Sequence, residues 1–87
     1  MLGVNQMIEF HTIEPNEVKV KIALKGHTLR SFSLFIGVSH PFLSQVIKNK
    51  KNPSPIVAKK IADGLGRDMQ EIFLINLVSS KQSEGVK

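Results

Sequence analysis

The sequence contains no cysteine and no long apolar run. Without cysteine, the chain has no disulfide, no thiolate zinc site and no cysteine nucleophile. No apolar run approaches the roughly 18 residues that cross a bilayer, and the first ten residues lack the basic segment of a secretory signal. These absences favour a soluble cytoplasmic protein with no membrane attachment.

Acidic residues are missing from the middle of the chain. Residues 18–62 carry nine Lys or Arg and no Asp or Glu, whereas residues 1–17 have a net charge of −3 and residues 63–87 a net charge of −1. A block of one charge sign opposes folding through self-repulsion, which makes physical sense where the partner is a polyanion. The alternative is a basic surface that only keeps a small protein soluble.

Length and apolar content fit one small domain with a modest core: the chain has 87 residues, of which 41% are hydrophobic. Capping residues and glycines recur at the spacing of helix starts and ends. They predict five helices, over residues 15–24 or 15–25, 29–36, 40–48, 55–64 and 69–78, and no strand after residue 14. The apolar positions of residues 1–13 fit a strand, a flexible arm or a packing flap.

Apolar residues at helical spacing predict the core. Those expected to face inward are Val18, Ile22 and either Leu24 or Val20; Leu29, Phe32 and either Phe35 or Ile36; Val57, Ala58, Ile61, Ala62 and Leu65; and Ile72, Phe73 and Leu77. The result is an all-α domain over residues 15–78, with an N-terminal arm of residues 1–14 and a polar C-terminal tail of residues 79–87.

Residues 40–48 divide completely into two faces at about 100° per residue. The apolar face holds Phe42, Leu43, Val46 and Ile47, and the polar face holds His40, Pro41, Ser44, Gln45 and Lys48. Ser39 is placed to cap this helix, and Thr28 is placed to cap the preceding helix, residues 29–36. Between the two helices, Gly37 fits a left-handed turn that Val38 plugs.

These residues resemble the helix-turn-helix of lambda-repressor-like, Cro-type (XRE) DNA-binding domains. The resemblance rests on Thr28, Ser33, the run Ile36-Gly37-Val38-Ser39, Leu43, Val46 and residues 49–54, and continues through residues 61–66 and 71–73. The order Lys25-Gly26-His27-Thr28 after a short first helix is also similar to phage Ner-like regulators. The resemblance implies a compact five-helix domain that binds double-stranded DNA, and a small repressor of phage or mobile-element type that binds a palindromic operator as a dimer.

In such a pair of helices, the first lies across the DNA backbone and the second reads base edges in the major groove. We therefore expect base contacts from His40, Pro41, Ser44 and Gln45, with Gln45 suited to an adenine edge. Backbone contacts are expected from Thr28, Arg30, Ser39, Lys48, Asn49, Lys50 and Lys51. Phe42, at the edge of the polar face, either contacts a thymine methyl group or packs in the core.

Three residues depart from the family pattern. Leu29 stands where the family often has a phosphate-binding glutamine, and Pro41 stands where a polar base-reading residue is common. Ile47 replaces a usual polar residue, which suggests either extra packing or a partner contact. These departures leave open a second hypothesis: a protein-binding adaptor, an antitoxin or an inhibitor of another regulator.

The N-terminal segment and the fifth predicted helix hold more apolar residues than one small core requires, so we expect a homodimer through the N-terminal arm, the fifth helix or both. The alternative is that the arm folds back over its own domain. His11, His27 and His40 are too scattered for a metal site, and no nucleophile–base pair is evident. We therefore expect no cofactor, no metal, no catalytic residue and no enzymatic activity.

Overall fold

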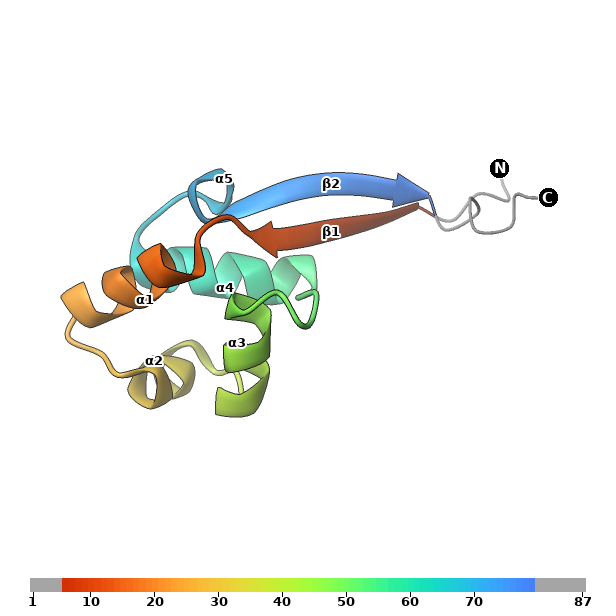
Figure 1. Cartoon of the computed structure of the whole chain (residues 1–87). Helices are drawn as coiled ribbons and strands as arrows, with labels where there is room; N and C mark the ends of the chain where they lie inside the picture. The colour runs from red at the N-terminus through yellow and green to blue at the C-terminus, as the bar shows by residue number, and fades with distance from the viewer. Residues whose placement is uncertain (1–5, 80–87) are drawn as a thin grey trace.

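The computed structural model describes residues 6–79, which form a helical body crossed by a two-stranded ribbon (Figure 1). The elements are β1 (Gln6–Thr12), α1 (Pro15–Leu24), α2 (Leu29–Ile36), α3 (His40–Ile47), α4 (Pro55–Leu65), α5 (Met69–Ile72) and β2 (Phe73–Ser79). The all-α architecture of five helices predicted from the sequence is confirmed over these residues, and one small sheet is added to it. Within the same residues, no helix is both long and apolar enough to cross a membrane.

The first four helices begin and end within one residue of the predicted positions, because the sequence carries their caps. Thr28, Ser39 and Ser54 each accept a hydrogen bond from the backbone N–H three residues later, at 3.0, 3.3 and 3.2 Å. Such a bond satisfies a donor that the first helical turn leaves free. Gly37 and Gly66 end α2 and α4 in the left-handed conformation.

The prediction of a fifth helix to Val78 is wrong, as is the prediction that no strand follows residue 14. α5 ends at Ile72, and the chain continues as β2. Residues 72–78 are apolar except for Asn76, and an apolar segment of this length fits either a helix or a strand. The antiparallel pairing with β1, more than 60 residues away in sequence, decides for the strand.

The open question about the N-terminal segment is answered for part of it: residues 6–12 form a strand. The register pairs Thr12 with Phe73, Phe10 with Ile75, and Ile8 with Leu77. The remainder of the expected arm, residues 1–5, and almost all of the expected tail, residues 80–87, lie outside the described residues.

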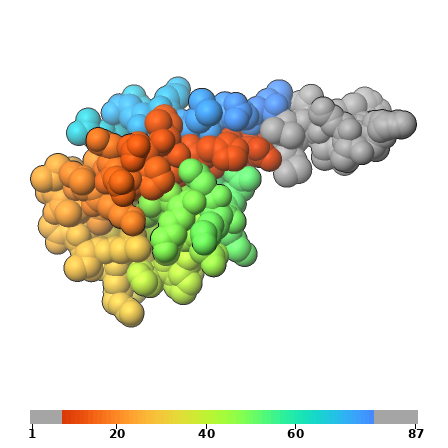
Figure 2. All heavy atoms as spheres, viewed as in Figure 1, coloured from red at the N-terminus to blue at the C-terminus, as the bar shows by residue number. Residues whose placement is uncertain are grey.

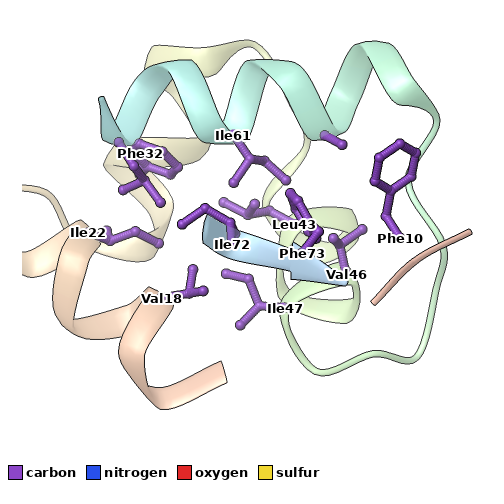
Figure 3. Packing of buried hydrophobic residues seen from close by; sticks show 12 residues of the cluster. Phe10, Val18, Ile22, Phe32, Leu43, Val46, Ile47, Ile61, Ile72 and Phe73 are labelled. Carbon is purple, nitrogen blue, oxygen red and sulfur yellow. The ribbon is translucent and has the colours of Figure 1, made fainter. Parts of the chain in front are cut away.

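The core lies between the four longer helices and the base of the ribbon (Figure 3). Phe10 and Phe73 enter it from the strands, with ring centroids 5.8 Å apart in an edge-to-face arrangement. The predicted inward residues that are buried are Val18, Ile22, Phe32, Leu43, Val46, Ile47, Ala58, Ile61, Ala62, Leu65, Ile72 and Phe73.

Four of the predicted core positions, three of which were offered as alternatives, are exposed instead. Val20 and Leu24 lie about 200° and 240° around α1 from Val18, so neither can share its buried face. Phe35 is exposed, and its alternative Ile36 packs against the core. Leu77 is exposed because it lies on β2 beyond the helical body.

Gly64 sets the distance between α2 and α4. A Cβ atom added there would lie 2.7 Å from Ile36 Cγ2 and 2.9 Å from the ring of Phe32. Both neighbours belong to α2 and pack in the core, so neither can move aside freely.

We expect Gly64→Ala to destabilise the protein, although alanine is the better helix former. The gain in helix propensity is about 1 kcal/mol, whereas overpacking a core contact costs about 1–3 kcal/mol. Urea unfolding followed by circular dichroism measures the difference. Lys60→Ala, one turn earlier on the exposed face of α4, serves as the control for helix propensity. A Gly64→Ala protein at least as stable as the parent would show that the two helices can separate at no cost.

Candidate nucleic-acid interface

α2, a tight turn and α3 form one continuous unit. Gly37 adopts φ 78°, and the N–H groups of Gly37 and Val38 both donate to the carbonyl of Ser33, at 2.9 and 3.0 Å. Val38 packs against the core, as predicted from its place in the turn. The turn therefore holds the end of α2 and the start of α3 in a fixed relation.

The apolar face of α3 is buried as predicted. Leu43, Val46 and Ile47 are all at most 2% exposed, and Phe42 is partly buried and packs against the core. Burial settles the alternatives for Ile47: it contributes packing and is not available to a partner. Phe42 packs on the core with only part of its side chain accessible.

The opposite face of α3 is open to solvent. Pro41, Gln45 and Lys48 are exposed, and His40 and Ser44 are partly exposed. Because the inner face is locked into the core, these five side chains share one outward direction. Figure 2 shows the atoms of α2 and α3, yellow to green, on the side of the helical body away from β2. The residues predicted to contact bases thus lie on one accessible helix face.

The start of α2 offers unpaired backbone donors beside this face. Thr28 Oγ1 accepts from Ser31 N–H at 3.0 Å, and Ser31 Oγ accepts from Thr28 N–H at 2.9 Å. This reciprocal pair leaves the N–H groups of Leu29 and Arg30, which have no acceptor within the helix, for a ligand. A helix start of this kind suits a phosphate group.

Exposed cations lie on α2, at the end of α3 and in the loop that follows α3. The four ion pairs of residues 6–79 join His11 to Glu9, Lys21 to Glu17, Lys59 to Asp63 and Arg67 to Glu71. Arg30, Lys48, Lys50 and Lys51 take part in none of these pairs and are exposed. Their charge is thus not compensated by neighbouring carboxylates and can act on a polyanion.

Asn49, predicted as a phosphate contact, has a structural role that the sequence did not reveal. Its Oδ1 accepts from the N–H of Thr12 at 2.7 Å, and its Nδ2 donates to the carbonyl of Thr12 at 3.0 Å. The Thr12 hydroxyl in turn donates to the carbonyl of Val46 at 3.0 Å. Asn52 Oδ1 accepts from the N–H of Phe10 at 3.1 Å. We call these four hydrogen bonds the asparagine clasp.

The asparagine clasp joins the C-terminal end of α3 to β1, and Figure 1 shows that end beneath the strand. Asn49 has φ 62°, a left-handed conformation that asparagine tolerates better than most residues. Its side-chain amide is therefore engaged by the strand, and its contact with phosphate stays a prediction. Two asparagines in a basic loop gave no signal of this role, because their partners lie about 40 residues away.

The three histidines lie apart in the structure as well. His27 Nδ1 is 2.9 Å from Ser31 Oγ, and its ring packs against Phe35 with centroids 5.1 Å apart. His11 contacts Glu9, and His40 begins α3. Among residues 6–79, no three His, Cys, Asp or Glu residues gather in a way that could hold a metal ion.

Comparison with known proteins gives one match. A family model described as helix-turn-helix matches residues 19–72, which is more than half of the chain and includes α2, the turn and α3. Neither the curated proteins nor the solved structures give a significant match.

We expect both Asn49→Ala and Asn49→Gly to lower the free energy of unfolding, by about 1–3 kcal/mol, because each leaves the buried backbone of Thr12 without its partners. Alanine should cost about 1 kcal/mol more than glycine, since only glycine adopts a positive φ without strain. Urea unfolding of both variants, beside Lys50→Ala as the exposed neighbouring control, tests this. If Asn49→Gly equals the parent protein in stability, the side-chain bonds to Thr12 contribute nothing.

Proposed function

The chain belongs to the XRE-type, Cro- and lambda-repressor-like family of helix-turn-helix DNA-binding transcription regulators, and on that premise we propose that it is a small repressor of phage or mobile-element type. It binds a palindromic operator in the cytoplasm as a dimer, with α3 in the major groove. The observation that carries this proposal is the open polar face of α3, together with four exposed cations on α2, at the end of α3 and in the loop after it that pair with no carboxylate of residues 6–79.

Within this proposal, the exposed Gln45 hydrogen-bonds a base edge, and His40, Pro41 and Ser44 share its groove. Pro41 offers no polar atom on its side chain, so its part is shape and apolar contact. Thr28, Ser39 and the N–H groups at the start of α2 meet phosphates, together with the side chains of Arg30, Lys48, Lys50 and Lys51. Asn49, in the loop that begins at the end of α3, stays a predicted phosphate contact, although its side-chain amide also binds Thr12.

A second candidate is a protein-binding adaptor, antitoxin or inhibitor of another regulator that keeps the same fold. It is favoured by Leu34 and Phe35, two exposed apolar side chains on the last turn of α2. An adaptor of this kind keeps its activity when Gln45 and Lys50 are both replaced by alanine, whereas a DNA-binding repressor loses it.

Selection of bound duplexes from a random pool tests the specific reading of bases. We expect a site of two symmetric half-sites, and we expect Gln45→Ala to relax the preference at one position of each half-site, by about 1–3 kcal/mol. Lys50→Ala serves as the matched control, because loss of a phosphate contact weakens all sequences alike. A selection that enriches no sequence, or an unchanged preference with Gln45→Ala, would contradict base reading by this residue.

The dependence of affinity on salt tests the phosphate contacts. On a single half-site duplex, the logarithm of the association constant should fall linearly with the logarithm of salt concentration, and Lys50→Ala should reduce that slope by about one. Fluorescence anisotropy across a salt series measures both slopes. Lys59→Ala is the control, since Lys59 already pairs with Asp63 at 3.0 Å. An affinity that hardly changes with salt would rule out phosphate neutralisation.

A further inference from the structure

One face of the ribbon begins in the core and ends in solvent. Side chains alternate along a strand, and paired residues share a face. The register therefore places eight residues on the face that meets the helices, which we call the inner face. From base to tip these are Thr12, Phe10, Ile8 and Gln6 of β1, paired with Phe73, Ile75, Leu77 and Ser79 of β2.

Exposure rises along the inner face from its base toward its tip. Thr12, Phe10 and Phe73 are 4%, 3% and 2% exposed, whereas Ile75 and Ile8 are 40% and 48% exposed, and Leu77 reaches 65%. Figure 1 shows the cause: β1 and β2 extend beyond the start of α4, so no helix lies beneath their far ends. Ile8, Ile75 and Leu77 thus continue the core face of the sheet past the helices that cover its base.

These three residues, which we call the overhanging inner face, are all apolar. Apolar area left in water costs roughly 25 cal/mol for each Å² that burial would remove. Exposed apolar patches on a protein surface often mark an interface with another molecule. Residues 6–12 and 73–79 contain no Lys or Arg, so the ribbon offers nothing to attract DNA.

Charge points to a second copy of this chain as the occupant. Two copies repel through their basic blocks of residues 18–62, which hold nine cations and no acid. The ribbon adds nothing to this repulsion, because residues 6–12 and 73–79 hold no Lys or Arg, and their one acid, Glu9, lies on the other face and contacts His11 at 3.1 Å. A second copy also brings the same apolar face, as a twofold contact requires.

We propose that the overhanging inner face, Ile8 with Ile75 and Leu77, is the surface through which two copies of the chain dimerise. The proposal deepens the proposed function, on which it rests, by naming the surface that joins the two halves of the repressor. The ribbon runs across the direction of α3 (Figure 1), so a copy docked at the far end of the ribbon lies beside the first and leaves its α3 free. A contact made mainly by three side chains favours a reversible dimer that forms as concentration rises.

The test compares two leucines of the same strand on the two faces of the ribbon. Leu77 lies on the inner face and is 65% exposed; Leu74 lies on the outer face and is 56% exposed. In sedimentation equilibrium of the full chain, we expect a concentration-dependent dimer. Leu77→Asp should weaken it about tenfold or more, since a charge would be buried between the copies, whereas Leu74→Asp should leave it unchanged.

Folding and DNA binding are followed separately. Thermal unfolding should be similar for both variants, because both leucines are exposed; Ile8→Ser repeats the test on the other strand if Leu77→Asp proves unstable. On a duplex with one half-site, all proteins should bind alike. On a duplex with two half-sites, Leu77→Asp alone should lose affinity, by about the same factor as its dimerisation, tenfold or more.

Three outcomes would overturn the proposal: a parent protein that stays monomeric at every concentration, a Leu74→Asp variant as impaired as Leu77→Asp, or a Leu77→Asp variant that dimerises normally. Monomers throughout would mean that the patch serves another protein or is covered by the chain itself. Failure of the proposed function would give a different result. A protein that dimerises through this face but binds neither duplex would support the dimer surface and contradict the proposed repressor function.

Discussion

The burial of one side of α3 is the constraint on which the rest of the structure depends. Leu43, Val46 and Ile47 are almost fully enclosed, so the helix can neither rotate nor slide without opening the core. The polar residues on its other side owe their common direction to this anchoring and not to contacts of their own. A helix of eight residues would not be stable alone in water, so α3 owes its stability to tertiary packing.

The two strands complete that core, and their far ends extend beyond the helices as the ribbon. Phe10 and Phe73 close the core from the ribbon, while the asparagine clasp attaches β1 to the end of α3. Asn49 hydrogen-bonds both the N–H and the carbonyl of Thr12, as a neighbouring strand would, and together with Asn52, which accepts from the N–H of Phe10, it satisfies backbone groups on the outer edge of β1. The ribbon and α3 are therefore held in one orientation by buried rings and by short hydrogen bonds.

The sequence predicted what is local and missed what is distant. Helix boundaries follow from caps such as Thr28 and Ser39, and the two faces of α3 follow from spacing alone, so both could be read without coordinates. β2 could not be predicted in this way, because its apolar segment is compatible with a helix or a strand, and only the pairing with β1 decides between them. The same reason hid the role of Asn49, whose partners are backbone atoms of a segment far away in sequence. The direction in which the polar residues of α3 face followed from the same spacing.

The distribution of charge explains why the two ends of this small domain are so different. A DNA-binding surface needs cations without nearby acids, and such a surface drives identical copies apart. A contact between two copies is therefore favoured where cations are absent, and the ribbon is the part of residues 6–79 that extends farthest beyond the helices without Lys or Arg. Because the asparagine clasp fixes the ribbon to α3, a contact between two ribbons would also fix the separation and direction of the two α3 helices. In the proposed dimer, the spacing of operator half-sites would then be set by the strands, which themselves contact no base.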